Sequence, residues 1–333
     1  MQYVPVLSAD GKPLMPCHPA RARELVRKGR AVRRFRKGFF YIRLLNRTDG
    51  EVQPVACGID PGSKWEAFSI VGPKRTYLNL HIDAVTHVKE NVEKRRMLRR
   101  NRRYRKTPNR KPRFNRARGG IPPSTRARWG WKLRIAGFLK GLYPISVFVV
   151  EDVKAHTKQG KKSWNVSFSP LQIGKQWFYE ELRKLSPVVT RSGWETKQFR
   201  ETFGLHKTSR KSAETFFAHA VDAWVLAASE VGATQPNYTG LIRMVPLQFR
   251  RRSLHLENPQ KGGKRRRHGG GTSFGLRRGA QVLHPKFGFC YVGGTMQDRL
   301  SLHDARTGKR LTQRAKIDDL VFLCNASWRI WKI

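Results

Sequence analysis

Acidic residues are scarce in this sequence of 333 residues, which has 23 Asp and Glu against 68 Lys and Arg. The formal net charge of +45 excludes a neutral surface, and a surface this basic collects polyanions. Long apolar runs are also missing. No stretch reaches the roughly 20 residues that span a bilayer, and the N-terminus lacks the apolar segment of a signal peptide. We therefore expect a cytoplasmic protein whose partner is nucleic acid and not a membrane.

Cysteine is nearly absent, and its placement argues against a zinc knuckle or ribbon. Cys17, Cys57, Cys290 and Cys324 are far apart, with no Cys-x-x-Cys pair and no histidine group beside them. The simplest interpretation is four free thiols in a reducing compartment.

The first 50 residues form a small basic unit that is too small to be an enzyme alone. A Pro-Leu-Met-Pro stretch (13–16) precedes a short helix that ends before Gly29, a usual helix stop. Apolar and aromatic residues around the Lys37-Gly38 turn then predict a hairpin. The expected elements are a helix at about 20–28 and strands at 31–36 and 39–45.

The central part of the chain predicts a mixed α/β core. Short links join three strands at 55–60, 66–71 and 75–83, which favours an antiparallel meander. The continuous apolar run 145–151 is typical of a central strand, and 212–230 has one apolar face at helical spacing. Between these we expect helices at 124–142 and 171–185, a strand at 188–190 and then a polar loop.

An intensely basic stretch, Lys89–Arg118, separates the meander from the rest of this core. Its first half, to about Arg105, has few helix breakers and should be helical, whereas Pro108 and Pro112 predict an extended second half. A charge run is often a solvated tail, but this one lies between two core segments, so we expect it to contact a phosphate backbone. The predicted nucleic-acid-binding residues are Arg95, Arg96, Arg99, Arg100, Arg102, Arg103 and Arg105.

The last hundred residues divide into two parts. Residues 246–278 are rich in Arg, Lys and Gly and predict a linker that orders on nucleic acid. Residues 279–333 alternate short apolar strands with turns, and we expect a small β-barrel there.

In a chain this basic, carboxylates at the ends of core elements need an explanation. Asp60 and Glu151 each close an apolar strand, and Asp222 lies on the amphipathic helix one turn after His219. Hydrolysis of a phosphodiester by two divalent ions about 4 Å apart needs carboxylates that converge from separate elements. Hard carboxylate oxygens suit magnesium, with manganese as an alternative.

Each carboxylate also has an ordinary explanation. An Asp before Pro-Gly, as at Asp60, is often a turn former. Glu151 can be a plain strand-end residue, with Asp152 as the better ligand. His219 and Asp222 can be the wet edge of a helix. It is the occurrence of all of them, on strand, strand and helix in this order, that favours a metal centre.

Three short motifs resemble the split segments of a RuvC nuclease, which has an RNase H-like fold. They are Ile59-Asp60-Pro61-Gly62, Val150-Glu151-Asp152 and His219-Ala220-Val221-Asp222-Ala223. The Arg-rich helix after the first motif resembles the bridge helix of RNA-guided CRISPR effectors. Pro-Leu-Met-Pro followed by Cys-His-Pro (17–19) resembles the PLMP domain of IscB proteins. Too few residues separate the second and third motifs for the HNH nuclease of IscB, so the chain resembles the HNH-less IsrB form.

The resemblance implies an α/β protein made of an RNase H-like (RuvC) core, an N-terminal PLMP domain, an Arg-rich bridge helix and a C-terminal β-barrel. The implied divisions are a PLMP domain (1–50), a first RuvC segment (51–88), a bridge helix with its extension (89–123), a second RuvC segment (124–155), a connecting segment in place of HNH (156–205), a third RuvC segment (206–235), and a basic linker with a domain that contacts the target-adjacent motif (236–333).

The resemblance also implies an activity: RNA-guided nicking of the displaced strand of duplex DNA in a prokaryotic cytoplasm. The partners would be a structured omega RNA, one protein per RNA, and the target duplex. Asp60, Glu151 and Asp222 would hold two Mg²⁺ ions, with His219 as a further ligand or an acid/base helper. Two other interpretations stay open: an unguided, structure-specific RuvC-type nuclease, and an RNA-binding protein without cleavage.

Overall fold

The structure of the chain is a computed structural model. It describes residues 3–106, 108, 121–152, 154, 156–157, 164–166, 172–238, 240–247, 272–296 and 298–333. The predicted extended half of the basic stretch and most of the predicted linker lie outside these residues. Among the described helices, none is both long and apolar enough to cross a membrane.

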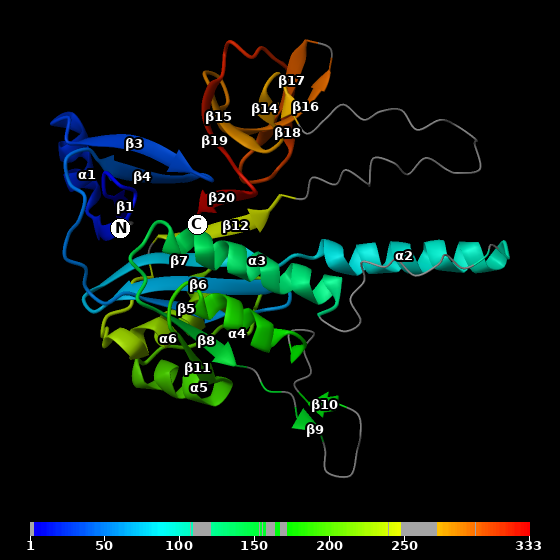
Figure 1. Ribbon diagram of the computed structural model, residues 1–333, viewed down its shortest axis with the longest axis horizontal. Helices are drawn as coiled ribbons and strands as arrows, with labels where there is room; N and C mark the ends of the chain where they lie inside the picture. Colours follow the sequence, from blue (N-terminus) through cyan, green and yellow to red (C-terminus); the bar gives the residue numbers. More distant parts are fainter. Residues whose placement is uncertain are drawn as a thin grey trace.

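A seven-stranded sheet forms the centre of the molecule, with the strand order β11-β8-β5-β6-β7-β12-β20 (Figure 1). The predicted antiparallel meander β5-β6-β7 is confirmed, and β8 and β11 extend the sheet parallel to β5. When the first five strands of this sheet are numbered 1 to 5 in chain order, their order across the sheet is 3-2-1-4-5, and only strand 2 is antiparallel to the others. This is the topology of an RNase H-like fold. These strands are β5 (Ala56–Asp60), β6 (Trp65–Gly72), β7 (Arg75–Asp83), β8 (Val147–Asp152) and β11 (Val188–Ser192).

Helices cover both faces of this sheet, so β5 is buried along its whole length. Successive residues of a strand point to opposite faces. Cys57 and Ile59 pack into the core formed with α3 and α4, whereas Ala56 packs into the core formed with α6. The helices are α3 (Pro123–Lys140) and α4 (Lys175–Arg183) on one face, and α5 (Gly193–Thr202) and α6 (Val221–Val231) on the other.

One expectation about the second half of the core was wrong, and a predicted helix begins later than expected. The predicted polar loop after β11 contains α5, which begins with a capping box between Ser192 and Glu195. The predicted helix 212–230 begins later, with a π-helical turn η2 (Phe216–Ala220) that continues into α6. A further strand, β12 (Leu241–Pro246), was not expected and pairs parallel with β7.

The N-terminal unit has the predicted helix and hairpin. Its four strands form a separate sheet in the order β2-β1-β4-β3, and the Pro-Leu-Met-Pro stretch is part of β2. The elements are β1 (Val4–Leu7), β2 (Pro13–Cys17), α1 (Pro19–Arg27), β3 (Ala31–Arg36) and β4 (Phe39–Leu44).

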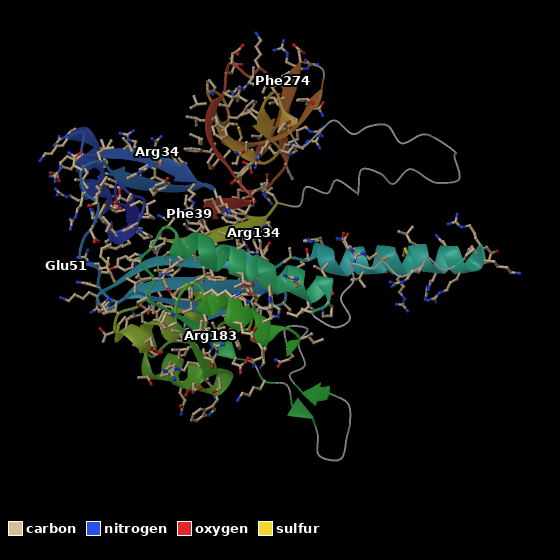
Figure 2. All side chains as sticks on the ribbon, in the orientation of Figure 1. Arg34, Phe39, Glu51, Arg134, Arg183 and Phe274 are labelled. Carbon is tan, nitrogen blue, oxygen red and sulfur yellow. The ribbon has the colours of Figure 1, made fainter. Side chains whose placement is uncertain are left out.

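The basic helix is confirmed as α2 (His87–Tyr104), which extends away from the sheet (Figure 1). Its arginine side chains project outward, with their nitrogen tips away from the core (Figure 2). The side chain of Arg102 lies outside the described part of the structure. The apolar side chains of Met97 and Leu98 are also exposed. This helix therefore has no core of its own along most of its length.

The C-terminal strands do not form the expected β-barrel. Five of them make an open antiparallel sheet in the order β18-β17-β16-β15-β19, and its edge strands are not paired with each other. The last strand, β20 (Trp328–Lys332), leaves this sheet and pairs with β12 at the edge of the central sheet. The five are β15 (Ala280–His284), β16 (Gly288–Met296), β17 (Arg299–Asp304), β18 (Arg310–Ala315) and β19 (Val321–Asn325). The remaining strands form two short pairs, β9 (His156–Thr157) with β10 (Trp164–Val166) and β13 (Thr272–Ser273) with β14 (Leu276–Arg277).

Candidate active site

Three carboxylates from three separate elements meet at one edge of the central sheet. Asp60 ends β5, Glu151 is the penultimate residue of β8, and Asp222 is in the first turn of α6. One carboxylate oxygen of each lies within 4.8 Å of the other two. Asp60 and Asp222 are buried, and Glu151 is half-buried. The structure thus brings together the three residues that the sequence predicted as metal ligands.

The strand order explains this convergence. β5 and β8 are parallel neighbours, so their carboxyl ends lie at the same edge, and their register sets Asp60 beside Glu151. Asp222 reaches this edge because α6 packs directly on the backbone of β5. A Cβ atom at Gly58 would lie only 1.8 Å from the carbonyl oxygen of Ala223. The absence of a side chain at Gly58 therefore lets the helix bring its carboxylate to the strands.

Asp152, the alternative to Glu151, faces away from this cluster. Alternate residues of β8 point to opposite faces of the sheet, and Asp152 points toward α4. There its carboxylate accepts hydrogen bonds from Lys175 Nζ at 2.7 Å and from the Tyr179 hydroxyl at 2.9 Å. The side chain that shares a face with Asp60 is that of Glu151.

His219 contacts Asp60 directly and lies in the π-helical turn that precedes α6. Because the Asp60 carboxylate can only accept, His219 Nδ1–H donates to its Oδ2, at 3.0 Å. The imidazole ring packs 5.4 Å from the His81 ring and 6.3 Å from Trp65. His219 Nε2 is buried and has no hydrogen-bond partner among the residues that the structure describes. The geometry therefore supports a residue that orients Asp60 through Nδ1.

Two basic side chains bind Asp222, and no motif in the sequence identifies either of them. Arg200 Nη1, from α5, donates to Asp222 Oδ1 at 2.6 Å, and Lys207 Nζ donates to Oδ2. Both partners come from the region predicted as a polar loop. In a chain with 68 Lys and Arg, a single cation does not stand out. Only the position of Asp222 in the fold identifies its partners.

The electrostatics of the cluster are those of a site built for cations. Burial raises the pKa of Glu151 to about 8, and the charges of Asp60 and Asp222 add to this effect. At Asp60, burial also raises the pKa, but the hydrogen bond from His219 and the charge of Lys207 outweigh it and lower the pKa. Burial lowers the pKa of Lys207, yet the carboxylates raise it overall. Because the three carboxylates lie so close together, the negative charge of one makes it harder to ionise its neighbour. Added positive charge, such as a bound cation, would reduce this effect.

The donor set fits a hard divalent cation. The three residues offer only carboxylate oxygens, and these are the ligands that Mg²⁺ and Mn²⁺ prefer. The raised pKa of Glu151 also suits a cation site, because a bound cation would favour the ionised form of this carboxylate. Asp60, Glu151 and Asp222 are therefore able to hold the metal that the sequence predicted.

The predicted nucleic-acid-binding arginines are not at this cluster. All of those with described side chains lie exposed on α2, and none contacts the three carboxylates. The fold and the cluster together define the class: an RNase H-like protein with a candidate acidic metal site, to which a basic helix is attached.

Residues 4–167 match the model of the family described as RRXRR protein. The matched part includes the run Arg99-Arg100-Asn101-Arg102-Arg103 in α2.

Two solved structures are similar to the chain, both of RuvC from Thermus thermophilus. The first, in complex with a Holliday junction substrate, has 15% sequence identity and a TM-score of 0.31, covering 56% of this chain and 100% of that one. The second has 14% identity and a TM-score of 0.30, covering 55% and 99%. These likenesses are weak, and the fold assignment rests on the strand order. No curated protein matches the chain.

Proposed function

We propose that this chain is a magnesium-dependent, RNA-guided DNA endonuclease of the IsrB type, which nicks the displaced strand of a target duplex. The observation that carries the proposal is the group of three carboxylates within 4.8 Å on an RNase H-like sheet. When bound, two divalent ions would activate the attacking water and stabilise the leaving oxygen.

The protein's own side chains prepare this site in two ways. Asp60, Glu151 and Asp222 supply the ligand oxygens. His219 orients Asp60, and Arg200 with Lys207 orients Asp222. Lys207 also lies close enough to act electrostatically on all three carboxylates. These contacts hold the ligands in place before any substrate arrives, which is what an in-line displacement requires.

Binding of a structured RNA is supported by charge and by α2. The net charge of +45 is not explained by the acidic cluster and indicates a large polyanionic partner. The exposed arginines of α2 whose side chains are described form no ion pair with the described residues. In guided systems, base pairing reads the target sequence, while the protein holds the backbone and a short duplex motif. A long basic helix attached to a nuclease core suits that division.

A nick, and not a double-strand break, is the product that this architecture favours. The described residues contain one group of side chains able to hold a metal ion. One such centre accepts one strand at a time. We therefore propose that the displaced, unpaired strand is cut and that the strand paired to the RNA stays whole.

The test is a target duplex labelled separately on each strand, incubated with the protein and the RNA that copurifies with it. With Mg²⁺ we expect cutting of the displaced strand only, and supercoiled plasmid should become open circle. EDTA should abolish both. Efficient cutting of the RNA-paired strand would contradict the nickase proposal.

Two other functions make different predictions about the bound RNA. An unguided nuclease needs only the acidic cluster and should cut its substrate without RNA. An RNA-binding protein without cleavage is disfavoured because all three carboxylates are present and converge. Sequencing the copurified RNA separates these cases. One defined RNA with a variable end supports guidance, whereas a mixture of cellular RNAs contradicts it.

The C-terminal sheet is the module that we propose reads the duplex motif. Truncation at residue 279 would not test this, because it also removes Trp328, which is fully buried against α3 residues Trp131 and Phe138. The fold offers a cleaner deletion. The Leu247 amide donates to the Ser327 carbonyl at 3.0 Å, so the ends of segment 248–326 are adjacent.

Replacing 248–326 by a two-residue Asn-Gly turn should therefore leave the β12–β20 pair and the core intact. The shortened protein should stay folded but lose target binding that depends on the motif. If it still selects targets by the same flanking bases, recognition lies elsewhere, with residues 1–50 as the next candidate.

A further inference from the structure

A large aromatic side chain is exposed on α5, the helix whose first residue lies close to the acidic cluster. Trp194, the second residue of α5, is 66% exposed. No other tryptophan is among the exposed large hydrophobic residues of the described part of the chain. It makes no ring contact with the described part of the chain. The buried side of α5 is formed by other residues, among them Thr196, while Phe199 packs against the core. The fold therefore does not use this indole for its own stability.

The position of Trp194 relative to the cluster follows from its neighbour. A Cβ atom built on Gly193 would lie 3.1 Å from Glu151 Oε1. Because consecutive Cα atoms are about 3.8 Å apart, the Trp194 backbone lies within roughly 9 Å of the Glu151 carboxylate. That distance corresponds to one or two nucleotides from a phosphate held at the cluster.

Two exposed lysines lie near the same end of α5, beside the carboxylate of Glu195. Lys154, just beyond β8, is exposed, and its charge acts on Glu195 in the first turn of α5. Lys197 is 62% exposed on the next turn, where it pairs with the equally exposed Glu201 at 3.6 Å. An exposed ring flanked by cations is the combination that binds single-stranded nucleic acid, because the cations follow the backbone while bases stack on the ring.

We propose that Trp194 is a stacking platform for an unpaired base of the strand that is cut. The inference rests on the proposed nuclease function and adds a substrate class to it. A base inside a duplex is already stacked on both sides, so the platform favours a single strand or an opened duplex. Trp194 would thus position the strand, while the carboxylates hold the metal.

The test joins changes in the protein to changes in the substrate. Full-length protein with its copurified RNA is given labelled DNA with a central unpaired bubble. A single abasic site is placed at each position around the cut. Wild type should lose on the order of tenfold in cleavage rate at one position, one or two nucleotides from the cut, since a base–aromatic stack contributes about 1–3 kcal/mol. Trp194→Ala should be slower on the intact substrate and insensitive to that abasic site.

Two further variants separate stacking from folding. Trp194→Phe keeps a ring and should retain most of the rate and of the sensitivity to the abasic site. Val52→Ala removes another exposed apolar side chain, 51% exposed between the N-terminal unit and β5, and should show the wild-type abasic profile. If Trp194→Ala has the wild-type rate, or the wild-type profile at every position, the platform does not exist.

The same substrates distinguish failure of this inference from failure of the proposed function. If wild type never cuts in Mg²⁺, the nuclease proposal fails. Equilibrium binding of the abasic series is then measured for wild type and Trp194→Ala. A position-specific loss that depends on Trp194 would keep the platform as a strand-binding site. Equal binding of every substrate by both proteins would overturn it, and would point to a protein partner for this exposed ring.

Discussion

The acidic cluster and helix α2 are built in opposite ways. The cluster places three carboxylates from three elements within 4.8 Å, two of them buried, each with its own partners or neighbours. Helix α2 carries many cations on one element, nearly all exposed and without a core behind them. In the first region, function depends on geometry that every nearby atom helps to define. In the second, it depends on the sum of charges that can replace one another.

This contrast predicts how each region responds to change. A single substitution in the cluster should have a large effect on cleavage. The position of the substituted residue should matter more than the charge that is removed. A single substitution on α2 should have a small effect that grows with the number of charges lost.

The largest effect is expected for Asp60→Asn. The amide keeps the shape and one oxygen that can still accept from His219, but it loses the negative charge and the second ligand oxygen, so the ion is misplaced. Cleavage should fall by at least about 1000-fold, while RNA binding stays unchanged, as measured by single-turnover cleavage and by filter binding. Asp152→Asn is the matched control, because this aspartate is also at the end of a core strand but faces α4. If both variants cut equally well, the active site is assigned to the wrong face of the sheet.

The packing beneath the cluster should tolerate change as poorly as the cluster does. Gly58→Ala would place a methyl group 1.8 Å from the Ala223 carbonyl oxygen, so α6 would have to move away from β5. We expect a loss of about 3 kcal/mol or more in the free energy of unfolding, together with loss of cleavage.

Gly130→Ala is the control for this change. Gly130 lies in α3, and a Cβ atom there meets nothing within 4 Å. It should stabilise the protein by up to about 1 kcal/mol through helix propensity. Chemical denaturation measures both variants. Equal stability of the two would mean that the close approach of helix and strand is not required.

The third prediction concerns pH and metal removal. The pKa of Glu151 is raised to about 8 by burial and by the neighbouring carboxylates, whereas in the unfolded chain it is about 4.3. Between these values the folded state holds a proton that the unfolded state releases, so stability must fall as pH rises. In EDTA we expect a loss of the order of 2–4 kcal/mol between about pH 5 and pH 8.

Magnesium should reverse this trend, since it binds the ionised carboxylate. Its stabilising effect should therefore grow as pH rises toward 8. Thermal unfolding with EDTA or Mg²⁺ across this range measures both. Glu151→Gln cannot ionise and should show neither the fall in EDTA nor the gain with Mg²⁺. A wild-type profile for this variant would assign the titration to another group.

The same contrast explains what could be predicted from the sequence. Asp60, Glu151 and Asp222 stood out because carboxylates are rare in this chain and each ends or interrupts an apolar pattern. Arg200 and Lys207 did not, because the sequence is crowded with identical residues. The partners of a buried carboxylate are visible only once the fold has placed them.

Errors in the fold have a similar origin. The alternation of short apolar segments with turns identified the C-terminal strands, but it carries no information on which sheet a strand joins. β20 was therefore assigned to a barrel, although it completes the central sheet through Trp328. Helix α5 was missed because its few apolar residues make a weak periodic pattern, and one of them, Trp194, is exposed. The π-turn at η2 has no sequence pattern that period counting detects.

The smallest single effects are expected on α2. Replacing any one of Arg96, Arg99, Arg100 or Arg103 by Gln should weaken RNA binding only a few-fold, because each contributes one screened contact to a phosphate. Replacing all four should lower the slope of log K against log salt by roughly 3, since each lost contact to single-stranded RNA removes about 0.7 from it. Filter binding between low and moderate salt measures the slope.

The control is the same set changed to Lys, which keeps the charge and should keep the slope. If the four Gln changes leave the slope unaltered, α2 does not contact the RNA, and the net charge of +45 acts elsewhere. If one Arg alone accounts for most of the loss, the helix makes a specific contact. The acidic cluster and α2 would then be more alike than their structures suggest, because the position of one side chain, and not only the total charge, would matter on α2 as well.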